Sequence, residues 1–127
     1  MTLTDDIRRR LARARTLLEG SSGQALPIPE VARRTGMSAF HFDRTFKSVF
    51  GETPHQYRMR HRLDRARHLL VATDLAVTEI CLALGFASLG SFSASFAERV
   101  GCSPTAYRTR ARPAKAPPLC MSLFAGT

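Results

Sequence analysis

Apolar residues recur along this chain at intervals of three and four, a pattern that predicts amphipathic α-helices separated by short polar turns. The first apolar face ends before a glycine-rich turn at residues 20–23 and consists of Ile7, Leu11, Ala14 and Leu18. We therefore expect an all-α fold that begins with this helix.

A repeat organises the chain after that turn. Five aromatic, glycine and proline residues recur 50 positions later: Phe42, Phe46, Gly51, Pro54 and Tyr57 correspond to Phe92, Phe96, Gly101, Pro104 and Tyr107. Upstream of them, Glu30 and Gly36 recur as Glu79 and Gly85 at a separation of 49. Five matches at one offset are not expected by chance, so the chain contains two copies of one structural unit.

Each copy predicts two helices joined by a tight turn. The first helix has an apolar face, which is Ile28, Val31 and Ala32 in one copy and Val77, Ile80, Cys81 and Leu84 in the other. A glycine suited to the left-handed conformation, Gly36 or Gly85, ends that helix, and Ser38 or Ser88 caps the next. The second helix buries a stripe of Phe42, Phe46, Val49 and Phe50, or of Phe92, Phe96 and Val100. This is the helix-turn-helix pattern.

A long basic helix connects the two copies. Thr53 and Pro54 suit its cap and first turn, and its expected inward face is Tyr57, Leu63, Ala66, Leu69 and Leu70. We expect residues 1–52 to hold the N-terminal helix and the first helix-turn-helix, 53–73 the connecting helix, 74–112 the second helix-turn-helix and 113–127 a tail. The apolar part of that tail, residues 119–124, is expected to dock on its own domain or on a partner.

Charge narrows the function. The 127 residues carry 19 Lys and Arg against 10 Asp and Glu, a net charge of +9, and all but Lys47 and Lys115 of the basic residues are arginine. Arginine suits bidentate contacts with phosphate and guanine, so the excess indicates a polyanionic partner. Residues 1–52 carry +3 and residues 53–127 carry +6.

Several classes of protein are disfavoured. The N-terminus lacks the basic and apolar regions of a signal peptide, and no stretch reaches the roughly 20 apolar residues of a membrane helix, so we expect a cytoplasmic chain without membrane contact. Three cysteines without C-x-x-C spacing, Cys81, Cys102 and Cys120, indicate neither a disulfide framework nor a metal site. No paired carboxylates, nucleophile–base spacing or phosphate-binding glycine loop indicates an enzyme, and no cofactor is expected.

The predicted length of the connecting helix is close to a repeat distance of B-DNA. A helix of about 20 residues is about 30 Å long, close to the spacing of about 34 Å between successive major-groove segments on one face of B-DNA. One chain is thus expected to hold two recognition helices one helical turn apart, and to bind an asymmetric site of double-stranded DNA as a monomer.

Longer motifs carry a specific resemblance. They are SAFHFDRTFK at residues 38–47, GETPHQY at 51–57, RLDRARHLL at 62–70 and GCSPTAYR at 101–108. These residues resemble the DNA-binding domain of AraC/XylS-type bacterial transcriptional regulators, over about residues 7–110. The resemblance implies seven helices with two helix-turn-helix motifs, usually in an activator that recruits RNA polymerase. The chain resembles the stand-alone members, which lack an effector or dimerisation domain.

The first recognition helix has five expected base contacts on the face opposite its buried stripe: Ala39, Phe40, Asp43, Arg44 and Lys47. The resemblance places the DNA-facing positions on the same face. Arg44 matches guanine O6 and N7, and its alternative is a surface ion pair with a nearby acid. Phe40 either contacts a thymine methyl group or lies in the core. Asp43 either accepts from cytosine N4 or orients Arg44.

The second recognition helix has fewer groups that read bases. Its expected contacts are Leu89, Gly90, Ser91, Ser93 and Ala94, and Ala94 stands where family members commonly carry arginine. We therefore expect the first helix to supply most base specificity, and the second to bind the backbone or an A·T-rich, deformable half-site. Phosphate contacts are expected from helix N-termini and arginines: Ser38, Thr53, Ser88 and Ser103, with Arg58, Arg99 and Arg108.

Two further interpretations concern the whole molecule. A membrane-surface helix would need the apolar residues that the connecting helix uses between the two copies. A protein-interaction module or anti-activator of the same fold stays open, because the second recognition helix has so few reading groups. Activators and repressors use the same contacts, so the sequence does not separate them.

Overall fold

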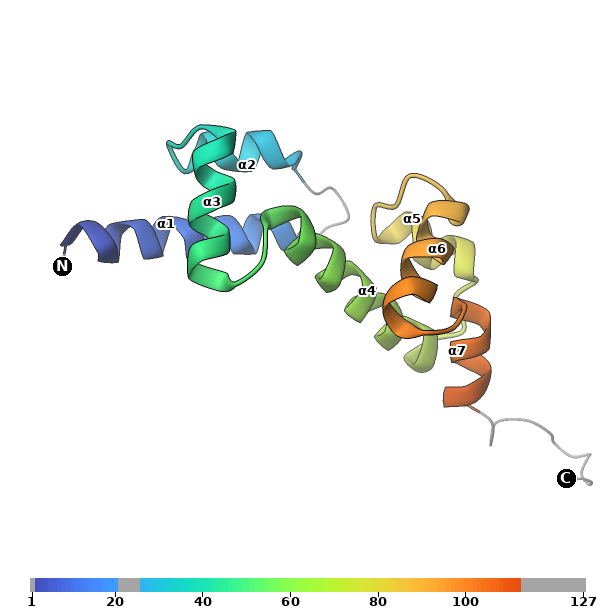
Figure 1. The fold of residues 1–127 in the computed structure, drawn as a ribbon. Helices are drawn as coiled ribbons and strands as arrows, with labels where there is room; N and C mark the ends of the chain where they lie inside the picture. Colours follow the sequence, from blue (N-terminus) through green and yellow to red (C-terminus); the bar gives the residue numbers. More distant parts are fainter. Residues whose placement is uncertain (1, 21–25, 113–127) are drawn as a thin grey trace, which may run out of the picture. The chain divides into compact units, whose positions relative to one another are not determined.

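The computed structural model describes residues 2–20 and 26–112, and Figure 1 shows its fold. Over these residues the chain forms seven α-helices and no strand, which confirms the all-α class: α1 (Thr2–Glu19), α2 (Ile28–Arg34), α3 (Ala39–Phe50), α4 (Pro54–Ala72), α5 (Val77–Ala83), α6 (Leu89–Val100) and α7 (Pro104–Ala111). The chain divides into two compact units, Met1–Asp64 and Arg65–Thr127, and the division lies inside α4. The apolar tail and most of the glycine-rich turn lie outside the described residues.

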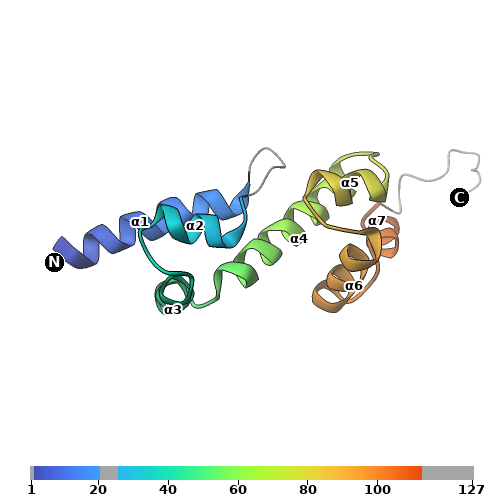
Figure 2. The same ribbon diagram turned by 90° about the horizontal axis from the view of Figure 1, so that it is seen from above.

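The first unit packs α1, α2 and α3 around one apolar core. α3 crosses α1 steeply, so that it stands upright in Figure 1 and is seen along its axis in Figure 2. The core consists of Leu11, Ala14, Leu18, Val31, Ala32, Phe42, Phe46 and Tyr57. The predicted stripe of α3 is right for Phe42 and Phe46 but wrong for Val49, which is 43% exposed. Because α3 crosses α1 instead of running along it, Val49 lines an open groove beside Ile7.

The second unit repeats the aromatic packing of the first. In the first unit the ring of Phe46 lies edge-to-face on Phe42 and on Tyr57, with centroids 5.6 and 5.9 Å apart. In the second unit Phe96 lies in the same way on its two equivalents, Phe92 and Tyr107, at 5.8 and 5.6 Å. Edge-to-face contacts are a favoured geometry of aromatic pairs. The residues of the fifty-residue repeat therefore form the same three-ring cluster twice.

The repeat also includes α1 and α4, which the sequence analysis did not detect. Three residues of α1 recur in α4 at a separation of 52, and all six are at most 1% exposed: Leu11, Ala14 and Leu18 correspond to Leu63, Ala66 and Leu70. The same order of leucine, alanine and leucine was a detectable signal in the sequence. It was missed because its separation is 52 residues, whereas the rest of the repeat has separations of 49 and 50. The helix predicted as a connector is therefore also the first helix of the second copy.

Glycines in α6 and at its end offer a test of this backbone. Gly101 ends α6 with φ 100°, whereas Gly90 lies inside α6, and a Cβ at either position would meet nothing within 4 Å. Gly101→Ala is expected to destabilise the protein by about 1–2 kcal/mol because of the left-handed backbone. Gly90→Ala should stabilise it by about 0.5–1 kcal/mol through helix propensity. Urea unfolding measures both, and changes of the same sign would contradict the assigned backbone.

Candidate nucleic-acid interface

Hydroxyl caps begin four of the helices, at the positions that the sequence predicts. Each cap oxygen accepts the main-chain N–H of the residue three positions later at 3.1 Å, and the four caps are Ser38, Thr53, Ser88 and Ser103. At α4 the cap is reciprocal, because Gln56 Oε1 also accepts from the Thr53 N–H at 2.9 Å. Each cap uses one N–H, and the others of the first turn keep the positive end of the helix dipole available to an anion. The caps are confirmed, and their phosphate contacts stay predictions.

The outer face of α3 presents all five predicted base contacts to solvent: Ala39, Phe40, Asp43, Arg44 and Lys47. Phe40 is 70% exposed, so the alternative that places it in the core is wrong. The Arg44 guanidinium carbon lies 5.4 Å from the centroid of the Phe40 ring, in a cation–π contact. Arg44 therefore packs against an aromatic ring while it stays exposed.

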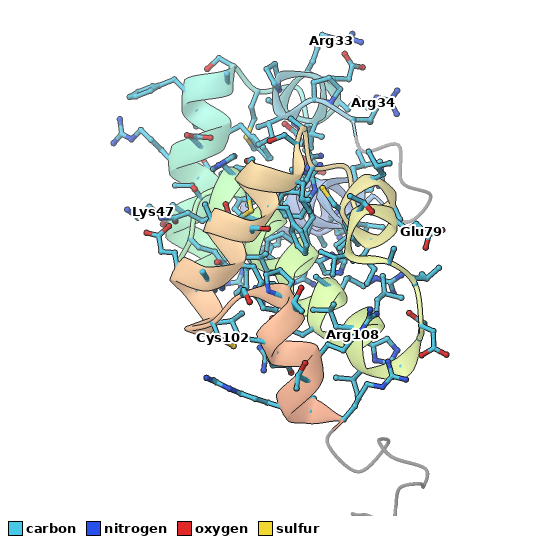
Figure 3. The ribbon with its side chains drawn as sticks, turned by 90° about the vertical axis from the view of Figure 1, so that its right-hand side faces the viewer. Arg33, Arg34, Lys47, Glu79, Cys102 and Arg108 are labelled. Atoms are coloured by element: carbon cyan, nitrogen blue, oxygen red, sulfur yellow. The ribbon has the colours of Figure 1, made fainter. Side chains whose placement is uncertain are left out.

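Two arginines of α2, which the sequence analysis did not single out, share one acid and leave one net positive charge with it on the first unit. Arg33 donates to the Glu30 carboxylate at 2.6 and 3.0 Å, and Arg34 donates to it at 3.1 Å. These hydrogen bonds, from Arg33 first, lower the pKa of Glu30. Both arginines are exposed, and Figure 3 shows them extending outward from α2, as Lys47 does from α3. Their signal in the sequence was the pattern Glu-x-x-Arg-Arg, which places both cations one turn from the acid.

The second unit has aliphatic residues at the four equivalent positions. Arg33, Arg34, Arg44 and Lys47 of the first unit correspond to Leu82, Ala83, Ala94 and Ala97 of the second, at the repeat offsets of 49 and 50. All eight residues are exposed, and Leu82 is 72% exposed. The equivalent faces of the two units therefore differ in chemistry: one is cationic and the other is aliphatic.

The other predicted contacts of the second unit lie at or near the surface. Leu89, Gly90 and Ser91 in the first turn of α6 are exposed, and Ser93 is half-buried. The main-chain N–H of Ser91 is already bound by the Ser88 cap. Arg99 is exposed in the last turn of α6. Their contacts with DNA stay predictions.

The predicted phosphate contact at Arg58 is wrong. Arg58 is only 7% exposed, and its Nε donates to the main-chain carbonyl of Leu18 at 3.0 Å. Burial lowers the pKa of this guanidinium. The last carbonyls of α1 have no partner within that helix, and the guanidinium of Arg58, on α4, donates to one of them. This hydrogen bond keeps the side chain inside its unit.

Arg108 has the equivalent place in the second unit, 50 residues later. Its Nε donates to the Leu70 carbonyl at 2.9 Å and its Nη2 to the Thr73 carbonyl at 3.2 Å. Figure 3 shows the side chain extending from α7. Two of its three nitrogens are bound to the end of α4, so Arg108 serves the fold, and we do not retain it among the proposed phosphate contacts.

The cationic character predicted for α4 is also reduced. Arg60 pairs with Glu52 at 2.7 Å and with Asp64 at 3.6 Å, and the hydrogen bond that Arg60 donates to Glu52 raises the pKa of Arg60. Among the arginines of α4, Arg58 is therefore buried and Arg60 is paired with two acids. The excess charge of the chain therefore overstates the charge that α4 presents to a partner.

The described residues show little sign of other chemistry. Within residues 2–20 and 26–112 no three His, Cys, Asp or Glu side chains lie together in a way that would hold a metal ion. Cys81 is a buried free thiol and Cys102 a half-buried one. None of the described helices combines the length and the apolarity needed to cross a membrane.

Comparison with known proteins identifies relatives of this arrangement. A family model described as a helix-turn-helix domain matches residues 31–110. The HTH-type transcriptional regulator Rv1931c of Mycobacterium tuberculosis is 40% identical over 89 residues, which are 70% of this chain and 34% of that protein. The HTH-type transcriptional activator AarP of Providencia stuartii is 32% identical over 91 residues, which are 72% of this chain and 67% of that protein. The chain spans about a third of the length of the first curated relatives that it matches.

Two solved structures share the fold. The DNA-binding domain of AdpA, a global transcriptional factor crystallised with a target DNA, has a TM-score of 0.75 at 31% identity, covering 84% of this chain and 97% of that one. An AraC-type regulator from Chromobacterium violaceum has a TM-score of 0.72 at 33% identity, covering 84% and 96%. Sequence and fold agree over most of the chain, and the chain belongs to the AraC-type family of helix-turn-helix transcriptional regulators.

Proposed function

We propose that this domain activates transcription by binding an asymmetric DNA site with α3 and α6 in successive major grooves. The observation that carries the proposal is the outer face of α3, where Phe40, Arg44 and Lys47 are exposed beside a capped helix N-terminus. The N-terminal residues of a recognition helix are those that contact base edges. The 19 residues of α4 correspond to about 28 Å of helix, near the spacing of about 34 Å between successive major-groove segments.

In this proposal the two units make different kinds of contact with the DNA. The first reads bases through Arg44 and its neighbours, and holds phosphates with the cations of α2 and α3. In the second, Leu82, Leu89 and Ala94 are exposed, so it contacts thymine methyl groups and the backbone of an A·T-rich half-site. The unequal faces favour an asymmetric site, since the two units present different side chains to the DNA.

The relatives support the biological setting. AdpA was crystallised with a target DNA, and AarP is a transcriptional activator whose length this chain spans to 67%. We extend DNA binding and activation to this chain, with RNA polymerase as the partner on the promoter. We also propose that the domain binds as a monomer, because its two units already supply two recognition helices.

A second candidate function is a protein-interaction module with weakened DNA binding. The specific observation in its favour is the exposure of Leu82 and Leu89, at 72% and 43%, in a unit that has no arginine or lysine at the four positions compared. The two candidates differ in a gel-shift experiment with random-sequence duplex. Retardation of the duplex supports the regulator, and its absence at micromolar protein supports the interaction module.

The salt dependence of binding tests the proposed function quantitatively. Each phosphate that a side chain neutralises contributes a slope of about −0.9 to log K against log salt concentration. With the exposed cations of α2 and α3 and further contacts from α6 and α7, we expect a slope of about −4 or steeper. Fluorescence anisotropy of a labelled duplex between 50 and 300 mM KCl measures the slope. A flat dependence would rule out the proposed phosphate contacts.

A further inference from the structure

Phe40 and Arg44 form one exposed element on α3. They lie four residues apart on the same face of the helix, and the guanidinium carbon of Arg44 is 5.4 Å from the centroid of the Phe40 ring. Phe40 is 70% exposed, so the ring is not used by the core. Arginine stacks on aromatic faces through cation–π attraction. The element therefore presents an apolar ring and a forked cation side by side.

The distance between the two groups limits what they read. Successive base pairs are about 3.4 Å apart, so groups separated by 5.4 Å reach one base pair or two adjacent ones. The fork matches O6 and N7 of guanine, whereas the ring matches the C5-methyl group of a pyrimidine. An unmodified G·C pair has no methyl group in the major groove, so the partner of the ring belongs to the neighbouring pair.

We propose that Phe40 and Arg44 together recognise a two-base-pair step, a guanine next to a pyrimidine that carries a C5-methyl group. The pyrimidine is thymine or 5-methylcytosine, which share that methyl group. This inference rests on the proposed function and adds the chemistry of the step that the first unit reads. The second unit does not share it, because Gly90 and Ala94 stand at the equivalent positions.

Phe40 is also a positioning residue for Arg44. A free arginine side chain loses rotamer entropy when it binds guanine. Stacking on the ring restricts the guanidinium before binding, so the guanine contact forms at a smaller entropic cost. Removal of the ring is therefore expected to weaken recognition of the guanine as well as of the methyl group.

The test uses the full chain and a duplex that it selects from random-sequence DNA. Each thymine of the duplex is replaced singly by uracil, and each guanine by 7-deazaguanine, which lacks the N7 acceptor. We expect one uracil to weaken binding about fourfold, the effect of one buried methyl group, next to one 7-deazaguanine that weakens it about tenfold or more. In Phe40→Ala the uracil effect should disappear and the 7-deazaguanine effect should shrink. In Arg44→Lys the 7-deazaguanine effect should also shrink, because an ammonium lacks the planar fork that binds O6 and N7 together.

A matched control and a methylation arm complete the design. Arg15 stacks on Phe50 at 4.9 Å in the same unit, so Arg15→Lys makes the same change elsewhere and should keep both effects. Replacing the identified thymine by 5-methylcytosine, with guanine opposite, should bind about fourfold more tightly than replacing it by cytosine. Equal binding of these two duplexes would show that the methyl group is not the group that is read.

Other outcomes separate this inference from the proposed function. If the two effects map to base pairs that are not adjacent, or if Phe40→Ala leaves both unchanged, the coupled reading is wrong while sequence-specific binding stands. If no sequence is enriched from the random pool, the proposed function fails and the inference fails with it.

Discussion

Replacing Phe46 by alanine is expected to unfold the first unit and to leave the second unit folded. The Phe46 ring is fully buried and lies 5.6 Å from Phe42, 4.6 Å from Phe50 and 5.9 Å from Tyr57, between ring centroids. Truncating a buried phenylalanine to alanine costs about 3–5 kcal/mol, as much as the core of a unit of fewer than about 70 residues supplies. A ¹H–¹⁵N correlation spectrum should lose the dispersed amide signals of α1–α3 and keep those of α5–α7.

The matched variant is Phe96→Ala, which makes the same change in the second unit. Phe96 is also fully buried and lies 5.8 Å from Phe92 and 5.6 Å from Tyr107. It should give the reverse pattern, with signals lost from α5–α7 and kept in α1–α3. Loss of both sets of signals in either variant would show that the two units unfold as one cooperative body.

Replacing Arg44 by alanine is expected to weaken binding to a selected duplex by about 5- to 150-fold. This range corresponds to the roughly 1–3 kcal/mol that one bidentate arginine–guanine contact contributes to discrimination between bases. Binding to random-sequence duplex should weaken much less, because that measurement registers only the loss of one charge. Anisotropy titrations of both duplexes at one salt concentration give the ratio that measures specificity.

Two controls make this result specific to the reading face. Arg15→Ala removes an arginine that also stacks on a phenylalanine, Phe50, at 4.9 Å, and it should change binding to the selected and random duplexes equally. Ser91→Ala alters a predicted contact of the second unit and should reduce specificity less than Arg44→Ala. A larger loss of specificity from Ser91→Ala would reverse the proposed division of work between the units.

Much of the fold followed from local patterns. The hydroxyl caps Ser38 and Ser88, and the left-handed glycines Gly36 and Gly85, lie where the sequence predicts them. Caps and glycine turns depend on residues within about one helical turn, so their signals survive in a single sequence. Val49 was misplaced because the apolar stripe gives the face of a helix but not the length over which a crossing neighbour covers it.

Glu30 and Glu79 occupy equivalent positions in the two copies, but they bind different groups because one neighbouring residue differs. Glu79 Oε1 accepts the main-chain N–H of Ala76 at 2.7 Å, at the start of α5. The equivalent acid, Glu30, has Pro27 at that position, and proline has no N–H to donate. Glu30 instead binds Arg33 and Arg34. The repeat predicted the two acids but not their different partners.

The sequence by itself determined the helices, the recurrence of the aromatic residues and the outward face of α3, because each depends on spacings along the chain. Only the tertiary structure decided which arginines are exposed. Arg58 binds the Leu18 carbonyl, 40 residues earlier in the chain, whereas Arg44 stays at the surface over Phe40. A long flexible cation can reach the unpaired carbonyls at the end of another helix, and local spacing does not encode that partner. Net charge therefore indicated the class of partner, and the packing of helix ends determined which cations remain available to meet it.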